Sequence, residues 1–103
     1  LIVVVVNKGF SDFVVDAARQ AGASGGTIIY GRGTGVHETD SILGVKLQPE
    51  KEVLLILVYR NKRKEIMKAI CENANLNEEG KGLCFSMPVN DIAGINHLIT
   101  KKK

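Results

Sequence analysis

Alternating glycines form the stretch of this chain that is best suited to binding a small ligand. Residues 27–37 read TIIYGRGTGVH, with Gly31, Gly33 and Gly35 at every second position after a short apolar run. Backbone without side chains permits positive φ and lets main-chain N–H groups approach an anion or a neighbouring chain. The stretch is therefore a candidate anion-binding turn. A twisted hairpin arm is an equally good interpretation of the pattern by itself, because no phosphate-binding lysine follows the glycines as in a P-loop.

His37 is the second candidate for chemistry, because imidazole binds metals and titrates near neutral pH. Only Glu38 and Asp40 lie nearby as oxygen ligands, and neither Cys71 nor Cys84 has metal-ligand spacing to a histidine. The two cysteines are predicted to be reduced, mostly buried thiols of a cytoplasmic protein. We therefore predict no metal site, while a metal-responsive trimer that uses His37 stays open as an alternative.

Enzyme and RNA-binding functions are disfavoured by motifs that the sequence lacks. It contains no G-x-x-x-x-G-K-[ST], G-x-S-x-G or H-E-x-x-H, and no cysteine adjoins a histidine in a form that suggests an activated nucleophile. The aliphatic segments 1–6 and 53–58 carry no aromatic residue on which a base could stack. We predict a non-enzymatic protein with no catalytic residues and no nucleic-acid partner.

Composition indicates one globular domain spanning residues 1–103. Apolar residues make up 45% and charged residues 24%, which is ordinary for a globular protein. The formal net charge is only +3, and the terminal run 101–103 is all lysine, so the charge is weak evidence for nucleic acid.

No apolar run approaches the roughly 20 residues needed to span a bilayer, so no membrane insertion is expected. The chain begins at Leu1, so residues before it are expected to be missing and targeting is left open.

Hydrophobic patterning predicts three elements in the first third of the chain. The run LIVVVV at 1–6 is typical of a central, buried strand. Ser11 is a candidate N-cap for a helix that ends at Gly22. A second strand is predicted over 27–33.

The rest of the chain is predicted to form a long loop and three further elements. Residues 35–48 lack periodicity, and a loop of that length in a small domain is more often functional than idle. A strand follows over 51–60, then a helix capped by Asn61, and a last strand over 83–87.

This β-α-β-β-α-β order predicts an α+β, ferredoxin-like sandwich, in which an antiparallel sheet carries two helices on one face. The first and third strands have apolar residues at both parities, so the sheet face away from the helices should also be apolar. Such a face needs a cover, and a sheet-to-sheet oligomer provides one.

The order and spacing of these segments resemble the PII nitrogen-regulatory signalling proteins over nearly the whole chain. The matching features are the aliphatic first strand followed by Lys8 and Phe10, the helix ending at Gly22, the Thr27 strand running into Gly33-Thr34-Gly35, the Lys51 strand, and Gly80-Lys81-Gly82 before Cys84-Phe85-Ser86-Met87-Pro88-Val89. The resemblance implies a homotrimer that binds ATP or ADP in clefts between subunits. It also implies that the long loop docks onto a regulated enzyme or transporter.

Transferred one position at a time, the resemblance implies ligand-binding roles for particular residues. The Thr27 strand and its glycines fall near the nucleotide base and ribose, and Lys51 matches a basic position at the start of the third strand. The turn 80–82 matches the loop that wraps the phosphates. The implied ligand-binding residues are Thr27, Gly33, Gly35, His37, Lys51, Gly80, Lys81 and Gly82.

The chain departs from the family at several charged positions. Val36 and His37 stand where the family has arginine and glutamine, Leu83 stands at the lysine position of the phosphate turn, and Gly94 and Asn96 fall near two usual arginines. Three arginines and one lysine of the expected triphosphate site are thus absent. The long loop is also shorter than in the family and has no tyrosine, so uridylylation is not expected there.

Together these features predict a trimeric PII-like regulator linked to nitrogen metabolism. Its effector would be a small anionic metabolite, with ATP and ADP as candidates, and no cofactor would be required. Ligand occupancy would be reported through the loop between the second and third strands. A structural or metal-responsive trimer of the same shape is the alternative.

Overall fold

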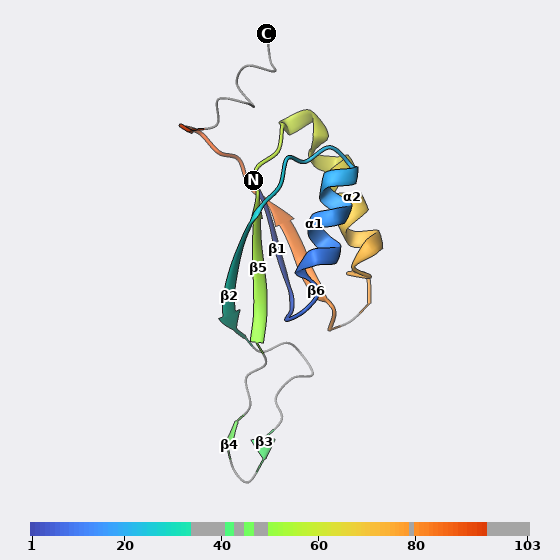
Figure 1. The fold of residues 1–103 in the computed structure, drawn as a ribbon, viewed down its shortest axis with the longest axis vertical. Helices are drawn as coiled ribbons and strands as arrows, with labels where there is room; N and C mark the ends of the chain where they lie inside the picture. The colour runs from blue at the N-terminus through green and yellow to red at the C-terminus, as the bar shows by residue number, and fades with distance from the viewer. Residues whose placement is uncertain (34–40, 43–44, 47–49, 79, 95–103) are drawn as a thin grey trace.

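The computed structural model describes residues 1–33, 41–42, 45–46, 50–78 and 80–94 of the chain. Figure 1 shows the helices and strands along the chain. They are β1 (Ile2–Asn7), α1 (Ser11–Gln20), β2 (Thr27–Arg32), β3 (Ser41–Ile42), β4 (Val45–Lys46), β5 (Glu50–Ile56), the 3-10 turn η1 (Arg60–Lys62), α2 (Arg63–Asn73) and β6 (Gly82–Ser86).

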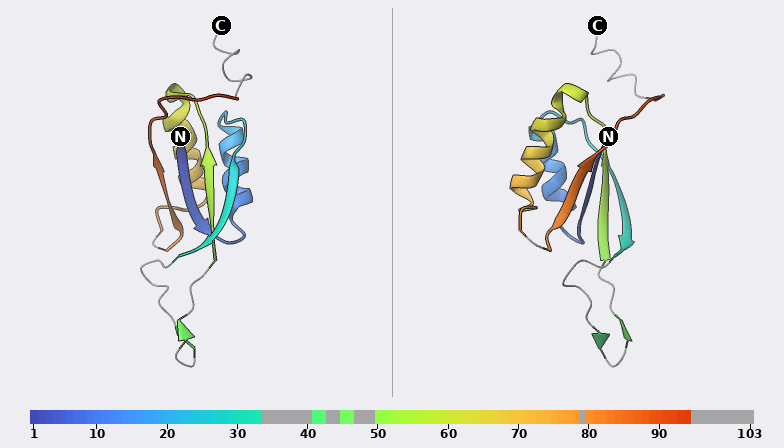
Figure 2. Two further views of the ribbon diagram at one scale, coloured as in Figure 1. Left: turned by 90° about the vertical axis from the view of Figure 1, so that its left-hand side faces the viewer. Right: turned by 180° about the vertical axis from the view of Figure 1, so that it is seen from behind.

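Four strands form one antiparallel sheet in the order β2-β5-β1-β6. Each helix links two strands that have a third strand between them, and both helices lie on the same face of the sheet (Figure 2). This is the split β-α-β arrangement of a ferredoxin-like fold, so the predicted α+β class is confirmed. No helix within the described residues is long and apolar enough to cross a membrane.

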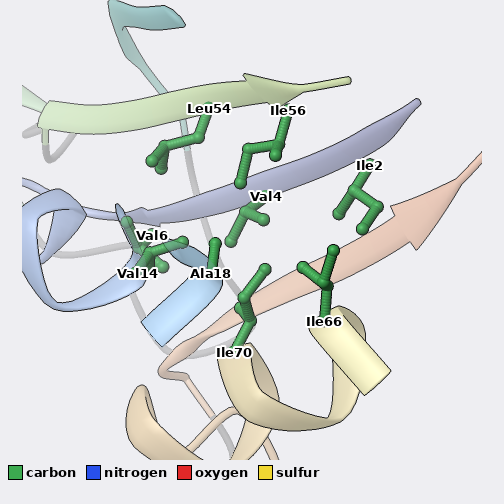
Figure 3. Close-up of a cluster of buried hydrophobic side chains, with 9 residues drawn as sticks. All are labelled: Ile2, Val4, Val6, Val14, Ala18, Leu54, Ile56, Ile66 and Ile70. Carbon is green, nitrogen blue, oxygen red and sulfur yellow. The ribbon is translucent and has the colours of Figure 1, made fainter. Parts of the chain in front are cut away.

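The hydrophobic core lies between the sheet and the two helices. Every second residue of β1 and β5 points toward the helices, as the period of a strand requires. One face of each helix, with residues spaced four apart, meets them there (Figure 3). The buried cluster consists of Ile2, Val4, Val6, Val14, Ala18, Leu54, Ile56, Ile66 and Ile70.

The opposite face of the sheet is apolar, as the strand parities predicted, and none of the described residues covers it. Register places Leu83 of β6 opposite Val5 and Phe85 opposite Val3, on the side away from the helices. Ile29 of β2 lies on the same side, opposite Val53. The exposed fractions of Ile29, Leu83 and Phe85 are 47%, 51% and 42%. We call this surface the open face.

Both predicted helix caps are wrong. Ser11 is the first residue of α1, and the capping position, Phe10, makes no side-chain hydrogen bond. Asn61 lies inside η1, and Lys62 precedes α2 without a side-chain cap. At the start of α1 a long-range contact is made instead, because the carboxylate of Glu52 accepts the N–H groups of Gly9 and Ser11.

Two predicted segment boundaries also differ from the structure. The strand predicted over 51–60 ends at Ile56, because Ile56 pairs with Ile2 at the very start of β1 and no partner strand extends further. The segment 35–48 was predicted to lack regular structure, but β3 and β4 form a short antiparallel pair within it. The other residues of that segment lie outside the described part of the chain.

Candidate functional site

Four strand ends meet at one end of the sheet. Because neighbouring strands are antiparallel, β1 and β2 end where β5 and β6 begin (Figure 1). Gly33 follows β2, Lys51 lies near the start of β5, and Gly82 opens β6. Residues far apart in the sequence, from both glycine-rich segments, are therefore neighbours at this end.

Lys51 is held at this end by the side chain of Asn7. Its Nζ donates a hydrogen bond to Asn7 Oδ1, and Asn7 Nδ2 donates in turn to the carbonyl oxygen of Gly80 at 3.5 Å. Lys51 also lies directly opposite Asn7 in the β1–β5 ladder, so both side chains lie on the open face. The ammonium group is thus connected through one amide side chain to the turn 80–82.

On the β2 side of Lys51, the neighbouring residues are two glycines, which have no side chains. Gly31 lies opposite Lys51 in the β2–β5 ladder, and a Cβ built there would meet no heavy atom within 4 Å. A Cβ on Gly33 would lie 3.5 Å from Lys51 Cγ, which is ordinary van der Waals contact. The lysine stem therefore lies beside bare backbone, and its charge lies between two glycine-rich segments.

The turn 80–82 contains two glycines with positive φ. Gly80 has φ +82° and Gly82 has φ +141°, both in the region that disfavours other residues. The N–H of Lys81 donates to the carbonyl oxygen of Glu78 at 3.3 Å, so this donor is already used inside the turn. The Lys81 side chain is exposed and able to contribute a second positive charge.

Thr27 is not part of this cluster. It begins β2, opposite Leu55, at the end of the strand away from Gly33. At about 3.3 Å per residue, six residue steps separate the two by roughly 20 Å. One small ligand cannot contact both within a single chain. Gly35 and His37, which were also predicted to bind ligand, lie outside the described residues.

Sequence reasoning missed Asn7. The available signal was a polar residue at the end of the aliphatic run LIVVVV, directly before a glycine corner. Its role becomes visible only from the register that places it opposite Lys51. An amide side chain can both accept from an ammonium and donate to a carbonyl, whereas an ionised carboxylate can only accept.

Lys8 and Arg32 add two more cationic groups at this end, of which Lys8 is paired. Lys8 Nζ lies 2.7 Å from Glu50 Oε2, with both side chains more than half exposed. The hydrogen bond and charge of Glu50 raise the pKa of Lys8, and those of Lys8 lower the pKa of Glu50. Arg32 lies opposite Glu50 in the ladder and is exposed. The strand ends thus carry several cationic groups beside Lys51, in keeping with an anionic ligand.

The arrangement suits anion binding better than catalysis or metal binding. A positioned ammonium between glycine backbones offers charge and close main-chain approach, which are the needs of a phosphate or carboxylate. Within the described ranges, no group of three or more His, Cys, Asp or Glu side chains could hold a metal ion.

Comparison with protein families places residues 1–97 within one family, described as nitrogen regulatory protein P-II. A search of curated proteins finds no match. The matched range includes every residue of the cluster around Lys51 and the turn 80–82.

Proposed function

We propose that this chain, which belongs to the nitrogen regulatory protein P-II family, binds a small anionic metabolite at the end of the sheet that holds Lys51. Family membership makes it a nitrogen-regulatory signalling protein. The finer proposal is that ATP or ADP binds in clefts between the subunits of a homotrimer. The ligand contacts would come from Gly33, Lys51 and the turn 80–82.

The observation that carries the proposal is the position of Lys51. This cation is fixed by Asn7, lies beside Gly31 and Gly33, and is linked through Asn7 to Gly80. Two separate glycine-rich segments thus converge on one positive charge. That convergence favours a bound anion over a purely structural role for the glycines.

Signal output would use the segment between β2 and β5. That segment leaves the sheet directly after Gly33 and returns just before Lys51, so both of its ends adjoin the proposed ligand. A ligand that binds more tightly with the segment in one conformation would favour that conformation. The size of the shift is limited by the difference in affinity between the two states, and a partner enzyme or transporter would recognise the favoured one.

The homotrimer is supported by the open face. Members of this family are typically trimers, and an uncovered apolar sheet face is the surface that such an assembly would bury. Replacing Leu83 by lysine should dissociate the assembly, because three ammonium groups would be forced into its apolar interior. Sedimentation equilibrium should then give a species near the 11.2 kDa chain mass in place of about three times that mass.

Phe13→Lys is the matched control for the trimer. Phe13 is exposed to a similar degree, 59%, but lies on α1, on the other side of the sheet. Its replacement should leave the assembly intact. A wild-type monomer at micromolar concentration would contradict both the trimer and binding sites between subunits.

The ligand proposal is tested by titrating wild type and Lys51→Met with ATP and ADP in a calorimeter. Loss of a charged hydrogen-bonding partner should weaken binding by about 10- to 100-fold, since such contacts are worth roughly 1.5–3 kcal/mol. Lys68→Met is the control, because Lys68 is exposed on α2 and should bind as wild type does. Sedimentation of each variant would show whether the assembly is retained.

Two outcomes would overturn this proposal in different ways. Equal affinity of Lys51→Met and wild type would remove Lys51 from the ligand site. If neither nucleotide bound to a trimeric wild type, ATP and ADP would be excluded as ligands. The effector would then be a different small molecule.

A further inference from the structure

The two cysteines of the chain face one another across the contact between α2 and β6. Cys84 lies opposite Val4 in the β1–β6 ladder, which places its side chain on the helix side of the sheet, against the buried core. Cys71 is half-buried on α2, directly after the buried Ile70. Burial raises the pKa of Cys84, the Cys71 thiol lies close enough to raise it further, and both side chains are half-buried.

These cysteines bracket the glycine turn. Cys71 is near the end of α2, Cys84 is near the start of β6, and residues 74–81 connect the two elements. A covalent bond between them would close a ring that contains the turn. Gly80 of that turn accepts the hydrogen bond from Asn7, so the ring would include a direct neighbour of the Lys51 cluster.

We propose that Cys71 and Cys84 form a reversible dithiol–disulfide site, which takes a low-molecular-weight disulfide such as glutathione disulfide as its oxidant and ties α2 to β6 around the glycine turn. This site is independent of the function proposed above. Only its effect on ligand binding rests on that function.

The reaction proceeds by two thiol–disulfide exchanges. The thiolate of Cys71 attacks one sulfur of glutathione disulfide, forms a mixed disulfide and releases one glutathione thiolate, which takes up the proton that Cys71 lost. Cys84 then loses its proton and attacks the Cys71 sulfur, which releases the second glutathione. The protein loses two electrons and two protons, and one glutathione disulfide becomes two glutathione thiols.

The order of the two attacks follows from the surroundings of Cys84. Burial, together with the neighbouring Cys71 thiol, raises the pKa of Cys84 to about 11. Cys84 is therefore almost entirely protonated at neutral pH and is a poor first nucleophile. It acts second, when the mixed disulfide is already held beside it and the attack is intramolecular.

The test is oxidation of the full native chain in glutathione buffers of graded ratio, followed by alkylation of remaining thiols and intact-mass measurement. Wild type should lose two hydrogens, resist alkylation and yield a linked Cys71–Cys84 peptide, all reversed by dithiothreitol. Cys84→Ser should stop at one glutathione adduct on Cys71, whereas Cys71→Ser, which keeps only the poorly nucleophilic Cys84, should form its adduct much more slowly. Stable glutathione adducts or disulfides between chains in the wild type would overturn the proposal. This outcome does not depend on whether the serine variants fold.

Comparison with the urea-unfolded chain tests whether the fold itself brings the thiols together. In the native chain, half of the protein should be oxidised at a ratio of reduced glutathione to its disulfide at least about tenfold higher than in the unfolded chain. If both forms were oxidised at the same glutathione ratio, the fold would not favour the disulfide. That result would contradict the proposed dithiol–disulfide site.

Hydrogen exchange tests the effect on the turn without any ligand. In the oxidised wild type, the amides of 75–82 should exchange about tenfold more slowly, while those of α1 stay unchanged. A disulfide that forms without slowing these amides would refute the link to the turn. Nucleotide titration of the oxidised and reduced forms would then measure the effect on ligand binding separately.

Discussion

Replacing Glu52 by alanine is expected to lower the free energy of unfolding by about 3 kcal/mol. The side chain is only 5% exposed, and its Oε1 accepts N–H groups from Gly9 at 2.9 Å and Ser11 at 3.1 Å. Removing it leaves these donors without their partner at the start of α1 and opens a small cavity. Urea denaturation at fixed protein concentration measures the loss, since a trimer's stability depends on concentration.

Two further variants separate the charge from the packing of Glu52. Glu52→Gln keeps an acceptor oxygen and the shape, so it should cost less than alanine, about 1 kcal/mol. Glu50→Gln changes an exposed carboxylate on the same strand and should have little effect. Equal stability of Glu52→Ala and wild type would mean that solvent or another group satisfies the start of α1.

The same contacts predict how stability depends on pH. Burial of Glu52 by itself would raise its pKa, but hydrogen bonds from Gly9, Ser11 and Phe10 outweigh it and hold the pKa below the ordinary value of 4.5. A carboxyl group with a lowered folded pKa stabilises the fold fully above its unfolded pKa. That contribution is lost as pH falls from about 4.5 through the folded pKa. Glu52→Gln should therefore show a shallower loss of stability below pH 4.5.

Glu52 shows what local sequence pattern can and cannot reveal. Burial alternates along β5 in the structure, but residues 53–56 are apolar at both parities, so the sequence does not show which of them face the helices. The same alternation places a carboxylate among buried aliphatic residues, which periodicity alone cannot explain. Its partners are 41 and 43 positions away, so only the folded register shows that Glu52, and not Ser11, satisfies the start of α1.

The candidate site was predictable to a similar extent. Glycine spacing and the resemblance to the family indicated Gly33, Lys51 and the turn 80–82, and antiparallel pairing brings these together. Asn7 was missed because its role depends on a cross-strand neighbour. Thr27 was grouped with them by resemblance, although strand length keeps it at the other end of the sheet.

Replacing Gly82 by alanine is expected to destabilise the protein by about 3 kcal/mol or more. A Cβ at this position would overlap the carbonyl oxygen of Val5, which is backbone of the central strand and cannot move aside cheaply. It would also lie 3.2 Å from side-chain atoms of Leu76 and Val6, and φ is +141°. The start of β6 would have to separate from β1. Urea denaturation and hydrogen exchange at Gly82 and Leu83 would measure this change.

Two other glycine substitutions provide a graded comparison. Gly31→Ala meets open space at ordinary φ and should change stability by no more than about 0.5 kcal/mol. Gly80→Ala also meets open space, but φ is +82°, so the backbone alone should cost about 1 kcal/mol. Wild-type stability for Gly82→Ala would contradict the described approach of β6 to β1.

This comparison decides how the ligand site should be tested. Gly82→Val would abolish ligand binding even if Gly82 never touched the ligand, because the strand that carries the turn would be displaced. Gly33→Ala adds only an ordinary contact with Lys51, so it should fold as wild type does. Weaker binding of an anion to Gly33→Ala at unchanged stability would therefore report on the site itself, whereas the same loss in Gly82→Val would report on the fold.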